Sequence, residues 1–260
     1  MIRGDYAPYH RTSIPDSSHA VPSFRLFQQN AADVNPRTQT QCPRRVTRSP
    51  TDNVLTVATF LIELSPSDMQ RRLFEALTVY VDAMRYPRGT EDQRASMWLE
   101  HIRRRGWKGV AAIETPPDHA FESGSPPEHL HEIPAAVLLG IAYGYCGAPD
   151  QWWHQQVTQG LRRIGVPGGE ISRLMSSYFE LTELHIHPRA QGRGLGEALA
   201  RRLLANRPES NVLLSTPEIN GETNRAWRLY RRLGFNDIIR SYHFAGDPRP
   251  FAILGRSLPL

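Results

Sequence analysis

The stretch "HIHPRAQGRGLGEALARRLL", residues His185 to Leu204, places three glycines within five residues, at the point where a hydrophobic strand ends and a helix begins. Backbone N–H groups at a helix N-terminus point outward, and the absence of side chains lets an anion approach them. The hexapeptide "QGRGLG", Gln191 to Gly196, therefore predicts a loop that binds phosphate, with a flexible turn and helix cap as the alternative.

Two common nucleotide-binding patterns fit this loop poorly. A P-loop needs Gly-Lys-Ser/Thr, and the one lysine of the chain, Lys108, lies elsewhere. A dinucleotide-binding unit places its glycines after the first strand of a parallel series, with an acidic residue about twenty residues later. Here the loop comes late in the chain, and the strand that follows ends in "STPE". Both classes of nucleotide site are therefore disfavoured.

The composition predicts a globular protein without a membrane segment. The 260 residues are 40% hydrophobic, enough for the core of one large domain or two small ones. No segment approaches the roughly 18 uninterrupted apolar residues of a membrane span, and the N-terminus lacks the apolar stretch of a secretory signal. We therefore expect a cytoplasmic location and no membrane partner. The two cysteines, Cys42 and Cys146, cannot form a disulfide framework or a four-ligand zinc site on their own, and we expect free thiols.

The net charge of +5 is concentrated near the N-terminus. Residues 1–50 contain seven arginines and three aspartates, which leaves this segment at +4. No nucleic-acid recognition motif accompanies the charge, so we expect no nucleic-acid partner.

The chain divides into an extension and one domain. Residues 1–53 are rich in Pro, Ser, Thr, Gln, Asn and Arg and have no sustained hydrophobic period, which predicts a disordered or loosely packed N-terminal extension. Residues 54–260 contain the expected helices and strands of a folded domain. Within this domain, residues 148–177 form an insertion with a helix before the glycine loop.

Hydrophobic periodicity predicts an α/β fold for the domain. Apolar runs mark strands, and apolar residues three or four positions apart mark helices. The expected order β α α β β α β α β α β β gives one mixed sheet flanked by helices. The expected elements are a strand in Asn53–Leu64, a helix over about Asp68–Met84 capped by Ser65 or Ser67, a helix capped by Thr90, strands over Trp107–Glu114 and Ile133–Tyr145, a helix over Pro149–Gly165, the strand "YFELTELHIHP", the helix "GLGEALARRLLANR", the strand "NVLLSTPE", the helix of "NRAWRLYRRLGF" closed by Gly234, and strands in "DIIRSYHF" and "RPFAILGRSL".

Two motifs resemble those of the GCN5-related N-acetyltransferases (GNAT family). The segment "ELHIHPRAQGRGLGEALARRLL" is similar to the acyl-CoA-binding motif of that family, Q/R-x-x-G-x-G/A after a strand ending in V/I-x-P. Downstream, "NRAWRLYRRLGF" resembles the next family motif, an Asn followed by a helix that carries a Tyr and ends in Gly-Phe. The resemblance covers Leu55 to Leu258 in element order and Tyr178 to Phe235 in specific residues, and the second motif with "STPE" and "GDPRPFAILGR" is similar to actinobacterial members. It implies the GNAT fold, a mixed and mostly antiparallel sheet flanked by helices.

The resemblance also implies how the co-substrate acetyl-CoA is held. Its pyrophosphate is expected on the backbone of the glycine loop, and its pantetheine arm along the edge of the preceding strand. In the family, an Asn seven residues before the Tyr contacts this arm, whereas Asn224 lies six residues before Tyr230 and Thr223 takes the seventh place. The implied acetyl-CoA-binding residues are Leu184, His185, Ile186, Gln191, Gly192, Arg193, Gly194, Leu195, Gly196 and Asn224.

Acetyl transfer to an amine needs a proton acceptor and a proton donor. Tyr230 matches the general acid of the family, since a phenol can protonate the departing thiolate; a core tyrosine is the alternative. Glu180 and Glu183 are equal candidates for the base, with a water relay also open. Strict alternation along the strand predicts that these two glutamates face opposite sides of the sheet.

Two further features have open interpretations. Two pairs of histidines, His185 with His187 and His129 with His131, are spaced two residues apart, and on a strand this spacing lets both rings bind one metal ion. The GNAT family needs no metal for transfer, so we expect none. The tryptophans of "QWWHQQ" in the insertion either border the acceptor pocket or pack the added helix onto the core.

The predicted function is acetyl-CoA-dependent N-acetylation of a primary amine, by direct attack in a ternary complex. The acceptor is a small molecule or a peptide, from aminoglycoside-like antibiotics, polyamines and amino acids to protein N-termini. A non-catalytic acyl-CoA-binding module is the alternative. A homodimer is possible by analogy with the family.

Overall fold

The computed structural model describes residues 58–115, 130, 133, 135–218 and 224–260. The predicted extension, residues 1–53, and the histidine pair His129 and His131 lie outside these described residues. Among the helices that the structure describes, none combines the length and apolarity needed to cross a membrane.

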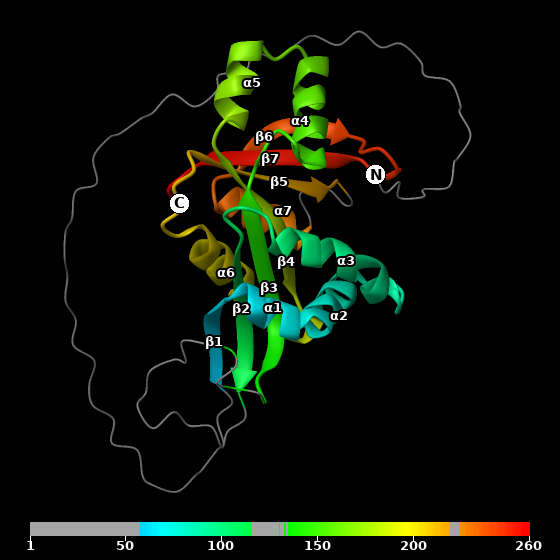
Figure 1. Cartoon of the computed structure of the whole chain (residues 1–260), viewed down its shortest axis with the longest axis vertical. Coiled ribbons are helices and arrows are strands. Elements are labelled where there is room, and N and C mark those ends of the chain that lie inside the picture. The colour runs from blue at the N-terminus through cyan, green and yellow to red at the C-terminus, as the bar shows by residue number, and fades with distance from the viewer. Residues whose placement is uncertain (1–57, 116–129, 131–132, 134, 219–223) are drawn as a thin grey trace, which may run out of the picture. The chain divides into compact units, whose positions relative to one another are not determined.

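The described residues form a mixed, mostly antiparallel sheet of seven strands, as predicted, and the strands lie in the order β1-β2-β3-β4-β5-β7-β6. Neighbouring strands are antiparallel except for β4 and β5, which are parallel. In Figure 1, β2, β3 and β4 run up the picture, whereas β5, β7 and β6 run across it. The strands are β1 (Ala58–Leu64), β2 (Lys108–Thr115), β3 (Val137–Cys146), β4 (Tyr178–Ile186), β5 (Asn211–Pro217), β6 (Asn236–Tyr242) and β7 (Phe251–Ser257).

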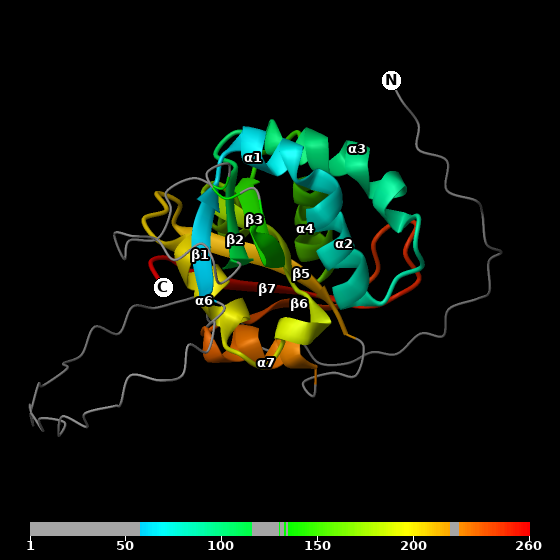
Figure 2. The same ribbon diagram turned by 90° about the horizontal axis from the view of Figure 1, so that it is seen from below.

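Helices cover both faces of the sheet (Figure 2). On the first face, which we call the α6–α7 face, α6 and α7 pack with alternate side chains of β2 to β5 and β7 into one core. On the other, the α2–α3 face, α1, α2 and α3 cover β1 to β3, and α4 and α5 cover β5, β6 and β7. The helices are α1 (Pro66–Arg71), α2 (Leu73–Met84), α3 (Thr90–Ile102), α4 (Trp152–Arg163), α5 (Gly168–Met175), α6 (Leu195–Leu204) and α7 (Arg225–Arg232).

The helix starts differ from expectation in two places. Ser65 caps α1 as predicted: its hydroxyl accepts a hydrogen bond from the Asp68 amide, and the Asp68 carboxylate accepts one from the Ser65 amide. The predicted helix over Asp68–Met84 is interrupted at Arg72, so that α1 and α2 are separate. The predicted cap at Thr90 is wrong, because Gly89, with φ of 93°, precedes α3 and Thr90 is its first residue.

The insertion contains a second helix that the sequence did not predict. The run "GVPGG" suggested only a break after the first helix, but α5 begins at Gly168, directly after Pro167. Its buried residues Ile171, Leu174 and Met175 pack with α4 against β5 and β6. The apolar spacing of these three residues is the signal that the prolines and glycines before them obscured.

Candidate active site

Strands β4 and β5 pair over only three residues and then diverge. Tyr178 to Glu180 pair with Asn211 to Leu213, after which β5 continues alongside β7 alone. From Leu181 onward, the β5-facing edge of β4 has no strand neighbour among the described residues. Leu184, His185 and Ile186 lie on this unpaired edge, so their backbone groups on that side are available to a ligand.

A β-bulge in β4 brings both candidate bases to the same face. Tyr145 pairs with Glu180 and Tyr143 with Glu183, so Thr182 is an extra residue opposite β3. Because Tyr143 and Tyr145 share one face, Glu180 and Glu183 share it too, and the predicted opposite orientation is wrong. Gly144 makes the bulge possible, since a Cβ there would lie 2.1 Å from the Glu180 carbonyl oxygen.

Glu180 is a buried carboxyl group, 4% exposed, on the α2–α3 face. The Tyr145 hydroxyl donates a hydrogen bond of 3.2 Å to Glu180 Oε1, and Arg104 Nη1 donates one of 2.7 Å to the same hydroxyl. Glu180 Oε2 has no partner within the part of the chain that the structure describes. Burial raises the pKa of Glu180 to about 8, although the nearby Arg104 charge and the Tyr145 hydrogen bond act in the opposite direction.

Glu183 lies closer to the surface and is bonded to a neighbour on its own strand. Its carboxylate contacts His185 Nε2 at 2.5 Å, and the His185 ring packs against Tyr80 of α2 with a centroid separation of 4.9 Å. His187 instead contacts Asp82, at 3.3 Å. The two histidines therefore have different carboxylate partners, and no group of three or more metal-ligating side chains occurs in the described residues.

The glycine loop has the backbone that an anion site requires. Gly192 and Gly194 adopt φ of 81° and 79°, values that L residues rarely adopt, and a Cβ on either would meet nothing within 4 Å. Gly194 is the N-cap of α6, and no side chain caps its free amides. The loop is thus open on the side where side chains are missing, which is the arrangement that a phosphate group fits.

Side chains around the loop fix it and add positive charge. The side-chain amide of Gln191 donates a hydrogen bond of 3.0 Å to the Ile186 carbonyl through Nε2 and accepts one of 2.9 Å from Arg225 through Oε1. These two bonds connect the loop to β4 and α7. Arg193 reaches Thr59 of β1, at 3.2 Å. Gly196 is constrained differently, because a Cβ there would lie 3.2 Å from Leu229 of α7.

Helix α7 carries Tyr230 and begins at Asn224. Tyr230 is buried on the α6–α7 face, and burial, with a smaller contribution from the Glu183 charge, raises its pKa well above the ordinary value. A phenol is protonated at neutral pH even at its ordinary pKa near 10, and the raised pKa makes Tyr230 a weaker acid than a free tyrosine. Asn224 Oδ1 accepts a hydrogen bond from the Ala226 amide and caps the helix.

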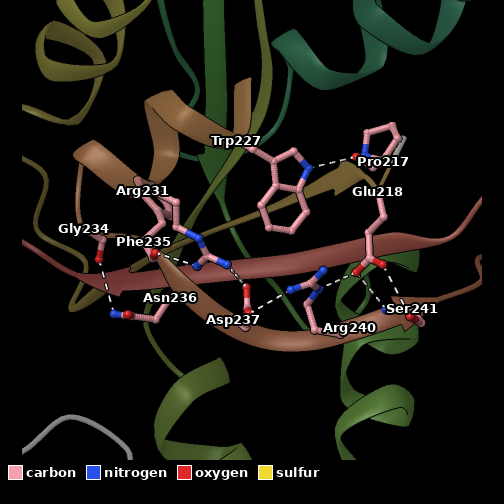
Figure 3. Close-up of polar contacts among 10 residues, drawn as sticks. All are labelled: Pro217, Glu218, Trp227, Arg231, Gly234, Phe235, Asn236, Asp237, Arg240 and Ser241. Atoms are coloured by element: carbon pink, nitrogen blue, oxygen red, sulfur yellow. Dashed lines mark hydrogen bonds and ion pairs between the residues drawn. The ribbon is translucent and has the colours of Figure 1, made fainter. Parts of the chain in front are cut away.

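A network around Trp227 holds α7 against the end of β5 (Figure 3). The indole Nε1 donates a hydrogen bond of 3.1 Å to the carbonyl of Pro217, the last residue of β5. The guanidinium groups of Arg231 and Arg240 lie over the ring. Both arginines bind Asp237 of β6, at 2.6 and 3.1 Å. These contacts fix the helix that carries Tyr230 relative to the diverging part of β5.

The two insertion tryptophans have different environments. Trp153 is buried in the core, where its indole Nε1 donates a hydrogen bond of 3.3 Å to the hydroxyl of Ser215 of β5. Trp152 is 51% exposed and packs against Phe244 with the two rings tilted by 35° and their centroids 5.5 Å apart. Packing onto the core is thus confirmed for Trp153.

Comparisons with known proteins identify the family. Residues 152–237 match the model of an acetyltransferase (GNAT) domain. The chain is 71% identical over 206 residues to the GCN5-like protein acetyltransferase Rv2170 of Mycobacterium tuberculosis, covering 78% of this chain and all of that protein. The chain belongs to the GNAT family of acetyltransferases. This GNAT enzyme is an acyltransferase, as the sequence motifs predicted.

Solved structures of GNAT proteins are also similar. A GNAT acetyltransferase from Desulfovibrio desulfuricans has a TM-score of 0.48 and 14% identity, covering 77% of this chain and 99% of that one. Arabidopsis thaliana NAA60, solved in complex with acetyl-CoA, has a TM-score of 0.47 and 16% identity, again covering 77% of this chain and 99% of that one.

Two residues next to a candidate base were not predicted from the sequence: Tyr145 contacts Glu180, and Arg104 contacts Tyr145. Arg104 follows α3 and Tyr145 is the penultimate residue of β3; both lie more than thirty positions from Glu180, and neither belongs to a family motif. The alternation "YGY" at Tyr143–Tyr145 was the available signal, because two tyrosines on one face of a buried strand need polar partners. Only the strand register showed that this partner is Glu180.

Proposed function

We propose that this GNAT enzyme transfers the acetyl group of acetyl-CoA to a primary amine of a protein or peptide. The divergence of β4 from β5, directly before a loop with two positive-φ glycines, is the observation that carries the proposal. The protein character of the acceptor comes from the name of the 71% identical relative, a protein acetyltransferase.

In this proposal the backbone holds acetyl-CoA. The amides of Gln191 to Gly196 receive the pyrophosphate, with positive charge from Arg193 and Arg225 nearby. The pantetheine arm lies along the unpaired edge at Leu184 to Ile186, where it replaces the missing strand. Capping uses Oδ1 of Asn224, so its Nδ2 is the group that would donate to the arm.

The residues proposed for the chemical step lie on opposite faces of the sheet, Glu180 on the α2–α3 face and Tyr230 on the α6–α7 face. The acceptor nitrogen attacks the thioester carbonyl, the C–N bond forms and the C–S bond breaks. Glu180 takes the proton of the amine through a water molecule, because its carboxyl group is buried and Oε2 is without a partner in the described chain. Tyr230 gives its proton to the thiolate of CoA, so that the products are the acetamide and free CoA.

We assign the base to Glu180 rather than Glu183 because their partners differ. A contact with His185 already occupies Glu183. Glu180 has a raised pKa, which makes it a stronger base once ionised, and one oxygen without a protein partner.

A free-thiol release assay tests the function directly. The enzyme is mixed with acetyl-CoA and one amine class at a time: lysine-containing peptides, peptides with free N-termini, polyamines and aminoglycosides, and products are identified by mass spectrometry. We expect the fastest release with a peptide amine and a mass gain of one acetyl group. Release with polyamines or aminoglycosides alone would contradict the peptide acceptor, and thermal stabilisation by acetyl-CoA without transfer to any class would contradict the function.

The same assay distinguishes the two glutamates. Glu180→Gln is expected to lower kcat by about 10²-fold or more, the usual contribution of a general base, and to remove the acidic limb of the pH profile. Glu183→Gln is the matched control at the neighbouring position on the same face. A larger loss in Glu183→Gln than in Glu180→Gln would transfer the role to Glu183.

A further inference from the structure

The two oxygens of the Glu180 carboxyl group have unequal surroundings. Oε1 accepts the hydrogen bond from Tyr145, whereas Oε2 is buried and lacks a partner among the described residues. Buried polar atoms in native proteins are nearly always hydrogen-bonded, so an unsatisfied carboxyl oxygen needs a reason. Oε2 therefore has both of its acceptor sites open to a proton or a hydrogen-bond donor, whereas Oε1 already uses one of its two.

Arg104 sets the direction of the hydrogen bond that holds Oε1. A guanidinium group has only donors, so in the 2.7 Å contact the Tyr145 oxygen must accept from Arg104 Nη1. The single hydroxyl proton of Tyr145 is then directed to Glu180 Oε1. Arg104 is itself held by stacking on the Tyr145 ring, 4.6 Å from its centroid, and by an ion pair with Glu100 at 3.3 Å.

We propose that Arg104 and Tyr145 are positioning residues, which form a hydrogen-bond chain of fixed direction that holds Glu180 Oε1 and presents Oε2 as the atom that takes the proton of the acceptor amine. This inference rests on the proposed function, in which Glu180 is the base. The N–H proton moves through the water to Oε2 as the C–N bond forms, and Tyr145 keeps its own proton throughout. Neither positioning residue touches the substrate.

The other titratable groups around Glu180 are uncharged or negative. Burial lowers the pKa of His101 of α3 to about 3 and lowers that of His154 of α4, so both rings are neutral at pH 7. Burial raises the pKa of Tyr143 of β3 and of Tyr178 of β4, which keeps these phenols protonated. The charge of Glu183 opposes ionisation of Glu180. The positive charge of Arg104 favours ionisation of this carboxyl group, so its loss is expected to raise the pKa of Glu180.

The test is a titration of Glu180 that needs no acceptor. The protein is labelled with glutamate carrying ¹³C at the side-chain carboxyl carbon, and the Glu180 signal is assigned by its disappearance in Glu180→Gln. Its chemical shift is then followed against pH in wild type, Tyr145→Phe and Arg104→Gln. Arg103→Gln is the matched control, because it removes the same charge from an exposed side chain one residue away.

We expect the midpoint to rise by about one pH unit or more in Tyr145→Phe and Arg104→Gln, the usual effect of removing a close opposite charge or its hydrogen bond. Arg103→Gln should leave it unchanged. An unchanged midpoint in both folded variants overturns the positioning role, as does an equal shift in Arg103→Gln. If Tyr145→Phe fails to fold, Arg104→Gln still decides, because its side chain is partly exposed.

Failure of this inference is distinguishable from failure of the proposed function. A fully active Glu180→Gln would show that Glu180 is not the base, whatever the titration gives. An inactive Glu180→Gln together with an unshifted midpoint in Tyr145→Phe and Arg104→Gln would keep Glu180 as the base and reject its positioning by these two residues.

Discussion

The glycine loop and Glu180 belong to the two ends of the same strand, β4, but they are built by different means. The loop follows Ile186 and is made of consecutive residues whose backbone conformation, with positive φ at Gly192 and Gly194, creates the open amides. The surroundings of Glu180 come from side chains on β3 and beyond α3. A site made of backbone is encoded locally, whereas a site made of side chains depends on strand register and packing.

The largest effect is expected for a substitution of Tyr230, which is encoded by a local motif but depends on packing for its environment. Tyr230 lies in a local sequence motif, yet its raised pKa depends on burial against the α6–α7 face. Tyr230→Phe should lower kcat by about 10² to 10⁴-fold, the range of a lost general acid, with acetyl-CoA affinity unchanged. Calorimetric binding of acetyl-CoA and steady-state thiol release measure the two quantities. An unchanged kcat would reduce Tyr230 to a core residue.

Substitutions of the two tryptophans of α4 test how much packing on the core stabilises the insertion. Trp153→Ala should lower the free energy of unfolding by about 3 to 5 kcal/mol, because a buried indole leaves a cavity. Trp152→Ala, at the adjacent exposed position, should change it by less than about 0.5 kcal/mol. Urea denaturation gives both values. Equal losses would show that the two tryptophans do not differ in burial, and an acceptor KM raised only in Trp152→Ala would place the exposed ring beside the acceptor.

A single added methyl group tests the backbone-made site. Gly194→Ala forces an L residue into φ of 79°, at a cost of about 1 to 2 kcal/mol, so acetyl-CoA should bind roughly tenfold more weakly. Gly169→Ala is the control, since its Cβ also meets open space but its φ is not positive. Equal affinity in Gly194→Ala and wild type would mean that acetyl-CoA does not depend on this loop.

The pH dependence of stability tests the raised pKa of Glu180. Because the pKa of Glu180 is raised to about 8, the folded protein holds one proton more than the unfolded chain between about pH 4.3 and 8. Its contribution to stability is complete below that window and is lost as pH rises through it. The Tm of Glu180→Gln should therefore rise relative to that of wild type as the pH increases from about 5 to about 8. Parallel Tm curves for the two proteins would indicate an ordinary pKa.

Local signals in the sequence predicted what local geometry determines. The capping by Ser65, the closure of α7 by Gly234 and the loop "QGRGLG" each depend on a few neighbouring residues, and the structure has all three. The mixed, mostly antiparallel sheet was also predicted, because the pattern of elements resembles that of one family.

Features that depend on distant residues were not predicted. The bulge at Thr182 reverses the alternation of side chains along β4, and the sequence "FELTEL" contains no signal that predicts it. The bulge depends on Gly144 of the neighbouring strand, because a side chain there would clash with the Glu180 carbonyl. The contact between Tyr145 and Glu180 follows from that register. Alternation along a strand is therefore a reliable guide only where the ladder is regular.

Hydrogen–deuterium exchange with and without acetyl-CoA tests the central claim, that the unpaired edge of β4 and the glycine loop together hold the co-substrate. The account predicts slower exchange of backbone amides in Leu184–Ile186 and Gln191–Gly196 on binding, with little change in β6, the edge strand on the far side of β5 and β7. Protection confined to other segments, or binding without protection of either segment, would contradict it.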